Sequence, residues 1–97
     1  MIIVHDIFVC KPGNASKLAK LFKEMMADNK EFVNVLTDMT GQYNRVIMVS
    51  KFDSLSAFDK SWEDMAKDEE KMKKMKEKMA GYTDMYLTGS REIYRVW

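Results

Sequence analysis

The sequence predicts an α+β fold in which helices cover one face of a four-stranded antiparallel sheet. Three observations lead to this prediction. Four runs are rich in β-branched and aromatic residues, as strands are. The stretches between them carry apolar residues at spacings of three and four, the stripe of an amphipathic helix. Short segments containing Gly, Pro, Asn, Asp or Ser separate the runs, as turns do.

The first strand is predicted over residues 2–10. It reads as buried on both faces, because neither alternate set of its side chains is consistently polar. Residues 11–14 end it, since Pro12 cannot donate a hydrogen bond to a sheet. Asn14 or Ser16 is expected to cap a helix over residues 15–28. The apolar stripe of that helix consists of Leu18, Leu21, Phe22, Met25 and Met26.

Two β-prone runs, residues 32–39 and 45–52, follow with a short loop that contains Gly41, which predicts an antiparallel hairpin. Asp53 or Ser54 is then expected to cap the next helix. Its apolar stripe stops where Glu69 takes an expected apolar position, so we predict two helices, over 54–67 and 68–80. Acidic residues open the second of these and lysines end it, which suits the helix dipole.

The last strand is predicted over residues 84–97, with Gly89 and Ser90 as candidates for a bulge or bend. The resulting order, β-α-β-β-α-(α)-β, is the ferredoxin-like arrangement. A chain of 97 residues falls at the lower edge of common domain sizes. We therefore expect a single domain that spans residues 1–97.

Both faces of the predicted sheet are apolar. The first strand offers one set of apolar side chains to each face: Ile3, Ile7 and Val9 to one, and Ile2, Val4 and Phe8 to the other. Helices can cover only one of these faces. A second copy of the chain stacked on the other face would bury it in a symmetric contact, so we expect a homodimer. The alternative is a monomer with an exposed apolar patch.

Composition bounds the partners of the protein. The chain has 16 Lys and Arg against 15 Asp and Glu, and the two signs alternate, so no one-sided basic surface for nucleic acid is expected. No apolar run approaches the ~20 residues of a membrane span, and no signal-peptide pattern opens the chain. Cys10 is the only cysteine and cannot form an intrachain disulfide. We expect a cytoplasmic protein that binds neither nucleic acid nor membrane.

Short motifs resemble known proteins. The Lys-Pro-Gly turn at 11–13 is similar to the turn that opens the first helix in many dimeric α/β-barrel proteins. The segments 40–44 (Thr-Gly-Gln-Tyr-Asn), 52–55 (Phe-Asp-Ser-Leu) and 91–94 (Arg-Glu-Ile-Tyr) most resemble the NIPSNAP family. This resemblance implies a ferredoxin-like dimer whose sheets form a barrel. The family lacks an agreed biochemical role. Relatives in the superfamily include cofactor-independent monooxygenases of antibiotic biosynthesis and haem-degrading enzymes. The haem-binding relatives use a helical histidine, which the predicted helices here lack.

The lone histidine, His5, is the first candidate for acid–base chemistry. Asp6 follows it, but neighbours on a strand point to opposite faces, so the two cannot act as a dyad. The preferred interpretation is that His5 lies in the core or in an interface and makes its hydrogen bonds there, without a role in catalysis. Asp6 itself is expected to need a cationic partner if it is buried. Three arginines can supply one: Arg91, Arg95 and Arg45.

The remaining candidates belong to a pocket between helices and sheet. We take as candidate ligand-binding residues His5, Trp62, Tyr86 and Arg91. Other aromatic residues that can line a pocket, or instead anchor the core or an interface, are Tyr43, Tyr94 and Trp97. Flexible methionines on the inner helix faces can line an adaptable pocket or fill the core: Met25, Met26, Met65, Met72, Met75 and Met79.

The sequence contains no motif for metal binding or for phosphate binding. One His and one Cys without ligand spacing predict no metal site, and four scattered glycines form no phosphate loop. We assign no catalytic residue and expect no cofactor. The leading hypothesis is a small NIPSNAP-like homodimer that binds a small apolar or aromatic ligand. The alternatives are a cofactor-independent monooxygenase or isomerase, and a purely structural or partner-binding dimer that would lack a ligand-sized pocket.

Overall fold

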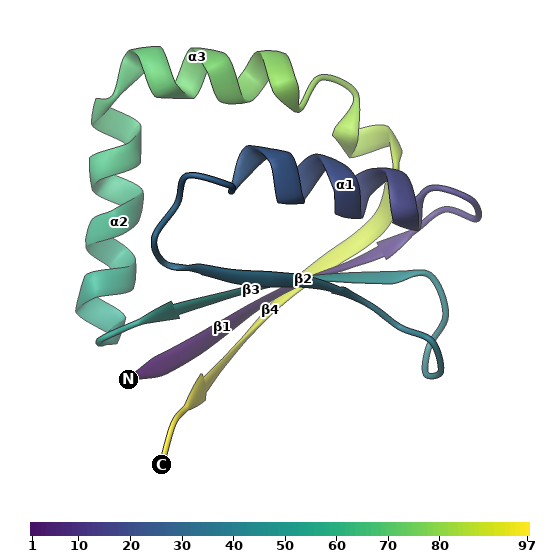
Figure 1. Cartoon of the computed structure of the whole chain (residues 1–97), viewed down its shortest axis with the longest axis horizontal. Helices are drawn as coiled ribbons and strands as arrows, with labels where there is room; N and C mark the ends of the chain where they lie inside the picture. The colour runs from purple at the N-terminus through teal and green to yellow at the C-terminus, as the bar shows by residue number, and fades with distance from the viewer.

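A computed structural model describes all residues, 1–97, as a four-stranded antiparallel sheet with its helices on one face (Figure 1). The strands lie in the order β2-β3-β1-β4, so β1 and β3 are central. Their bounds are β1 Ile2–Cys10, β2 Phe32–Thr37, β3 Arg45–Phe52 and β4 Tyr86–Arg95. The helices are α1 Ala15–Met25, α2 Leu55–Lys67 and α3 Glu69–Lys78, with a 3-10 turn η1 at Tyr82–Asp84. The predicted ferredoxin-like α+β fold is confirmed.

The two central strands begin and end at the predicted residues, whereas α1 ends three residues early and β4 is shorter than predicted. The bulge predicted at Gly89 is wrong. The register shifts where Val9 pairs with Thr88 and Cys10 pairs with Tyr86, so the unpaired residue is Leu87. Gly89 lies in the regular ladder opposite Phe8, and a Cβ on it would lie 3.7 Å from the Phe8 ring. That is an ordinary van der Waals distance, so neither the backbone nor the neighbouring ring requires a glycine at this position.

Side-chain caps define where two of the helices begin. The Ser54 hydroxyl accepts a hydrogen bond from the Ala57 N–H at 3.1 Å, so Ser54 and not Asp53 caps α2. The Asp68 carboxylate accepts one from the Lys71 N–H at 3.0 Å and starts α3, as the predicted division into two helices requires. Asn14 occupies the N-cap position of α1, but its side chain makes no capping hydrogen bond.

The β2–β3 loop is held by one carboxylate. Asp38 accepts hydrogen bonds from the N–H groups of Tyr43, at 2.8 Å, and Arg45, at 3.0 Å, and its Oδ2 lies 3.4 Å from Nε of Arg45. Desolvation alone would raise the pKa of Asp38. The backbone hydrogen bonds and the Arg45 guanidinium outweigh it, so the pKa lies below its usual value. The loop needs this anchor because Tyr43 and Asn44 both have positive φ, at 85° and 58°.

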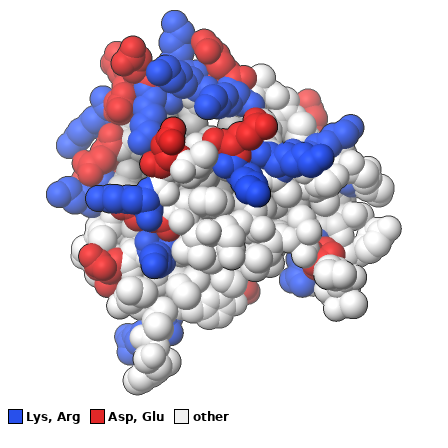
Figure 2. Space-filling model, in the orientation of Figure 1, with Lys and Arg blue, Asp and Glu red and all other residues white.

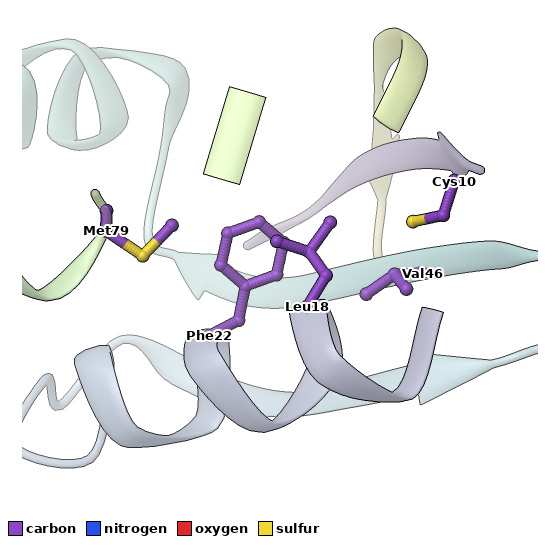
Figure 3. Close-up of a cluster of buried hydrophobic side chains, with 5 residues drawn as sticks. All are labelled: Cys10, Leu18, Phe22, Val46 and Met79. Carbon is purple, nitrogen blue, oxygen red and sulfur yellow. The ribbon is translucent and has the colours of Figure 1, made fainter. Parts of the chain in front are cut away.

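The hydrophobic core lies at one end of the sheet, where β1 finishes and β3 begins. Leu18 and Phe22 of α1 point at the strands there, as Figure 3 shows. The buried cluster consists of Cys10, Leu18, Phe22, Val46 and Met79. By contrast, α2 and α3 contribute no buried side chain from within their own bounds. The helix layer is therefore tightly packed over one half of the sheet only.

The sheet face that carries no helix is apolar at its centre. Ile7 and Val49 are buried on it by their neighbours alone. By alternation the same face also carries apolar side chains, Ile3, Val9, Leu36, Ile47 and Tyr94, and polar or charged ones, His5, Asn34, Arg45, Lys51, Thr88, Ser90 and Glu92. The helix-free face is therefore apolar at its centre, as predicted, but polar or charged toward its margins, and the homodimer inferred from it stays a prediction.

Charges of both signs are interleaved over α2 and α3 rather than separated (Figure 2). Much of the remaining surface in this view carries no charged side chain. None of the helices combines the length and the apolar character that crossing a bilayer requires.

Replacing Leu18 with alanine tests the position of the core. Leu18 is fully buried, so Leu18→Ala is expected to lower the free energy of unfolding by about 2–5 kcal/mol. Leu87→Ala is the matched control, because Leu87 is exposed in the bulge, and its effect should stay within about 0.5 kcal/mol. Urea unfolding at fixed protein concentration measures both. Equal effects would contradict the packing described here.

Asp38 gives a pH-dependent prediction. Its folded pKa is lowered, so it stabilises the fold above its unfolded pKa of about 3.9, and that contribution is lost as the pH falls through the folded value. Asp38→Asn is therefore expected to lower the urea midpoint at pH 7, and the gap from the unmodified protein should close below about pH 4. Asp59→Asn, at an exposed helix position, is the control. A gap that stays constant with pH would contradict this role.

Candidate functional site

A cavity of ≈ 390 Å³ lies between the helix-facing side of the sheet and the loosely packed helices. Its floor is formed by alternate residues of β1 and β3: Asp6, Met48, Ser50 and Phe52. Its walls come from α2 and α3, which supply Phe58, Trp62, Met65 and Met75 among others. The end of α1 and the segment after it close one side, with Met25, Met26, Asn29 and Glu31. The cavity exists because the core fills only the opposite half of the sheet.

Methionines give the cavity its apolar character. Of the six helical methionines that the sequence places on inner faces, four line it: Met25, Met26, Met65 and Met75. Met79 instead belongs to the buried core. Some of the methionines therefore line a pocket and another fills the core, which are the two roles that the sequence left open. Flexible thioethers can adapt the cavity to ligands of different shape.

One wall is held by an ion pair between two neighbouring strands. Asp6 on β1 pairs with Arg91 on β4, and Nε of Arg91 donates to Oδ1 of Asp6 at 2.6 Å. The guanidinium carbon of Arg91 lies 5.3 Å from the ring centroids of both Phe58 and Trp62 on α2. This is cation–π geometry. We call these four residues the Arg91 clamp; it joins β1, β4 and α2.

The clamp identifies the partner of Asp6 among the three arginines considered. Arg45 pairs with Asp38 instead, and Arg95 lies over the ring of Trp97, at 5.8 Å. The side chain of Asp6 is 14% exposed and that of Arg91 is 43% exposed, so the carboxylate is shielded while the guanidinium remains partly in water. The clamp thus presents its carboxylate and its two aromatic rings to the cavity.

Ser50 is the polar residue at the centre of the floor. It is 6% exposed, lines the cavity, and its hydroxyl takes part in none of the hydrogen bonds within the protein. No fully enclosed side-chain polar atom lacks a partner, so the Ser50 hydroxyl must reach the open space of the cavity. It is therefore free to bond a ligand.

The structure brings together two of the four candidate residues. Trp62 lines the cavity, and Arg91 contacts three residues that line it. Tyr86 lies at the other end of the sheet against Phe8, with ring centroids 5.0 Å apart. His5 lies on the helix-free face against Tyr94, at 5.1 Å. Neither Tyr86 nor His5 is at the cavity, and the expected separation of His5 from Asp6 is confirmed.

An aromatic pocket built from tyrosines does not form. Trp62 is the only candidate aromatic residue in the lining, and its companions are Phe52 and Phe58. Two residues of the site escaped the sequence analysis. Ser50 carries a signal, since it is a polar residue in the alternate set of β3 that is otherwise apolar. Phe58 stands four residues before Trp62 on the same helix face. Nowhere do three His, Cys, Asp or Glu side chains converge as metal ligands.

A double-mutant cycle tests the clamp. Arg91→Met leaves the shielded Asp6 carboxylate without its partner and is expected to lower the free energy of unfolding by about 1 kcal/mol, since Arg91 is partly in water. In the Asp6→Asn background the same change should cost less, because the charge that needed a partner is gone. Urea unfolding of the four proteins measures the coupling. If the effects of the two substitutions on the free energy of unfolding simply add, the ion pair does not stabilise the fold.

Solved structures of other proteins have the same fold as this chain. No protein-family model matches the chain, and no curated protein does. Among solved structures, an uncharacterised NIPSNAP domain protein from Burkholderia xenovorans has a TM-score of 0.79 at 12% identity, covering 100% of this chain and 95% of that one. A NIPSNAP family protein from Agrobacterium tumefaciens has a TM-score of 0.77 at 14% identity, covering 97% and 90%.

A candidate antibiotic biosynthesis monooxygenase from Deinococcus radiodurans is also similar, with a TM-score of 0.61, 13% identity and coverage of 100% and 93%. At these identities the likeness concerns the fold alone. The chain therefore shares the fold of solved NIPSNAP domain proteins along its whole length, and the resemblance that its short motifs predicted is confirmed at the level of the fold.

Proposed function

We propose that the protein is a homodimer that binds a small apolar or aromatic ligand in the cavity between its helices and its sheet. The observation that carries this proposal is the cavity itself. Its volume of ≈ 390 Å³ falls within the roughly 300–1,000 Å³ of small-molecule sites. Eight of its sixteen lining residues are methionine or aromatic and supply an apolar surface, and the other eight are polar or charged and can orient a ligand. The similar NIPSNAP domain protein from Burkholderia xenovorans is itself uncharacterised, so it does not indicate which ligand to expect.

The exposed ring of Trp62 supports ligand binding. A tryptophan that is 48% exposed beside a cavity leaves a large apolar surface for a ligand to cover. The alternative of a purely structural dimer predicted no ligand-sized pocket, and the cavity weighs against it.

The helix-free face of the sheet supports the dimer. Its buried centre at Ile7 and Val49 is surrounded by further apolar side chains, among which Leu36 is 42% exposed. A second copy stacked on this face would cover them by a self-complementary contact between identical surfaces. The cavity lies on the opposite side of the sheet, so each copy would keep its own ligand site.

A second candidate function is that of a cofactor-independent monooxygenase or isomerase. The likeness to the Deinococcus radiodurans structure is the observation that favours it. In such a reaction the substrate supplies the electrons, so the protein need only enclose it in a dry pocket with one or two polar groups. His5 lies outside the cavity, and Asp6 is the acid–base group on the floor. Turnover of a bound compound that is lost in Asp6→Asn would support this function.

Ligand binding is tested with N-phenyl-1-naphthylamine, a neutral dye that emits strongly in apolar pockets. We expect the dye to bind and Trp62→Ala to weaken its binding about tenfold, equal to about 1.4 kcal/mol, because the ring forms part of the wall. Trp97→Ala is the matched control, since Trp97 is fully exposed and outside the cavity. A dye that does not bind, or that binds both variants alike, would contradict the proposed site.

The dimer is tested with two matched substitutions. Leu36→Lys places a charge on the helix-free face, whereas Leu55→Lys places one on the exposed start of α2. In sedimentation, the unmodified protein and Leu55→Lys should have twice the chain mass of 11.4 kDa. Leu36→Lys should raise the dimer dissociation constant at least about tenfold, because a buried charge opposes the contact. A monomer in every case would overturn this part of the proposal.

A further inference from the structure

Two polar side chains lie on adjacent strands in the floor of the cavity. Val4 pairs with Ser50 and Asp6 with Met48 across β1 and β3, so Asp6 and Ser50 are diagonal neighbours on the same face of the sheet. Diagonal neighbours are separated by roughly 7–8 Å between Cα atoms, and their side chains can approach more closely. Both face the cavity. A single small polar group can therefore reach both.

Their hydrogen-bonding capacity is complementary. Oδ1 of Asp6 accepts from Arg91, which leaves Oδ2 as an acceptor. The Ser50 hydroxyl has no protein partner and can both donate and accept. A ligand hydroxyl satisfies this pair, because it can donate to Asp6 while it accepts from Ser50. An aliphatic or aromatic group without polar atoms would leave the Ser50 hydroxyl and Oδ2 of Asp6 without a partner while it covers them.

At the floor of the cavity, charge favours a neutral polar group. The cavity lining has four carboxylates, Asp6, Glu31, Asp64 and Asp68, against one lysine, Lys71, so an anionic ligand meets like charge. A cationic ligand is also disfavoured at the floor, because the Arg91 guanidinium, 2.6 Å from Asp6, already neutralises that carboxylate. A neutral donor avoids both penalties.

We infer that the cavity takes a neutral hydroxylated aromatic compound of the phenol class, whose hydroxyl bonds Ser50 Oγ and Asp6 Oδ2 while its ring lies against Trp62 and Phe58. This inference rests on the proposed ligand-binding function and deepens it. It assigns to Ser50 the role of selecting a hydroxylated ligand over an apolar one of the same shape.

Three compounds with one ring system test it: 2-naphthol, 2-methylnaphthalene and 2-naphthoate, which offer a hydroxyl, a methyl and a carboxylate. Isothermal titration calorimetry of the full chain should give 2-naphthol an affinity about fivefold to tenfold above that of either analogue. Ser50→Ala should remove most of the preference for 2-naphthol over 2-methylnaphthalene. It should bind 2-methylnaphthalene at least as tightly as the unmodified protein does, because the hydroxyl that this compound leaves unpaired is gone, and such binding also shows that the cavity is intact. Ser56→Ala, at an exposed serine outside the cavity, should keep the full preference.

The outcomes separate the two proposals. If none of the three compounds binds, the proposed ligand-binding function fails, and this inference fails with it. If all three bind alike, or 2-naphthoate binds best, ligand binding stands and the preference for a neutral hydroxyl is overturned. If Ser50→Ala binds 2-methylnaphthalene normally and still prefers 2-naphthol, the role of Ser50 is overturned.

Discussion

The packing of α1 against one end of the sheet is the constraint on which the rest of the structure depends. Leu18 and Phe22 of this helix complete the buried cluster with Cys10, Val46 and Met79. A helix that ends at Met25 cannot extend over the other half of the sheet. Only α2 and α3 remain to cover that half, and neither buries a side chain within its bounds. An off-centre core therefore produces the cavity, because close packing reaches only where α1 reaches.

The Arg91 clamp and the contact of Phe58 with Phe52 of β3, whose ring centroids lie 5.2 Å apart, together place α2 over the sheet. Phe58 and Trp62 contact the guanidinium of Arg91, and that group is tied to Asp6 on the central strand. These contacts lie at a few side chains and leave the neighbouring space as the cavity. The same arrangement leaves a carboxylate, a free hydroxyl at Ser50 and aromatic rings around one space. The side chains that attach the helix are thus the same ones to which we assign the proposed recognition of a ligand.

Local patterns predicted the elements, whereas contacts that depend on register or on layer spacing escaped prediction. The strands and the Ser54 cap follow from alternation and from hydrogen-bonding side chains, which are properties of neighbouring residues. The sequence predicted that Asp6 needs an arginine, but the choice of Arg91 depends on strand register. The bulge at Leu87 was missed because a register shift depends on the pairing of β4 with β1 and not on the local presence of a glycine. Ser50 escaped notice because no local pattern shows whether a strand residue meets a helix or an open space.

Native mass spectrometry of freshly purified protein tests the central claim most directly, since one spectrum reports both assembly and bound compounds. The claim is that the helix-free face pairs two chains while the opposite side of each sheet holds a small ligand. The expected spectrum shows twice the chain mass of 11.4 kDa, with a discrete additional mass that dissociates on activation as a neutral compound. A bare monomer under gentle conditions would contradict both the pairing of the two apolar faces and the use of the cavity.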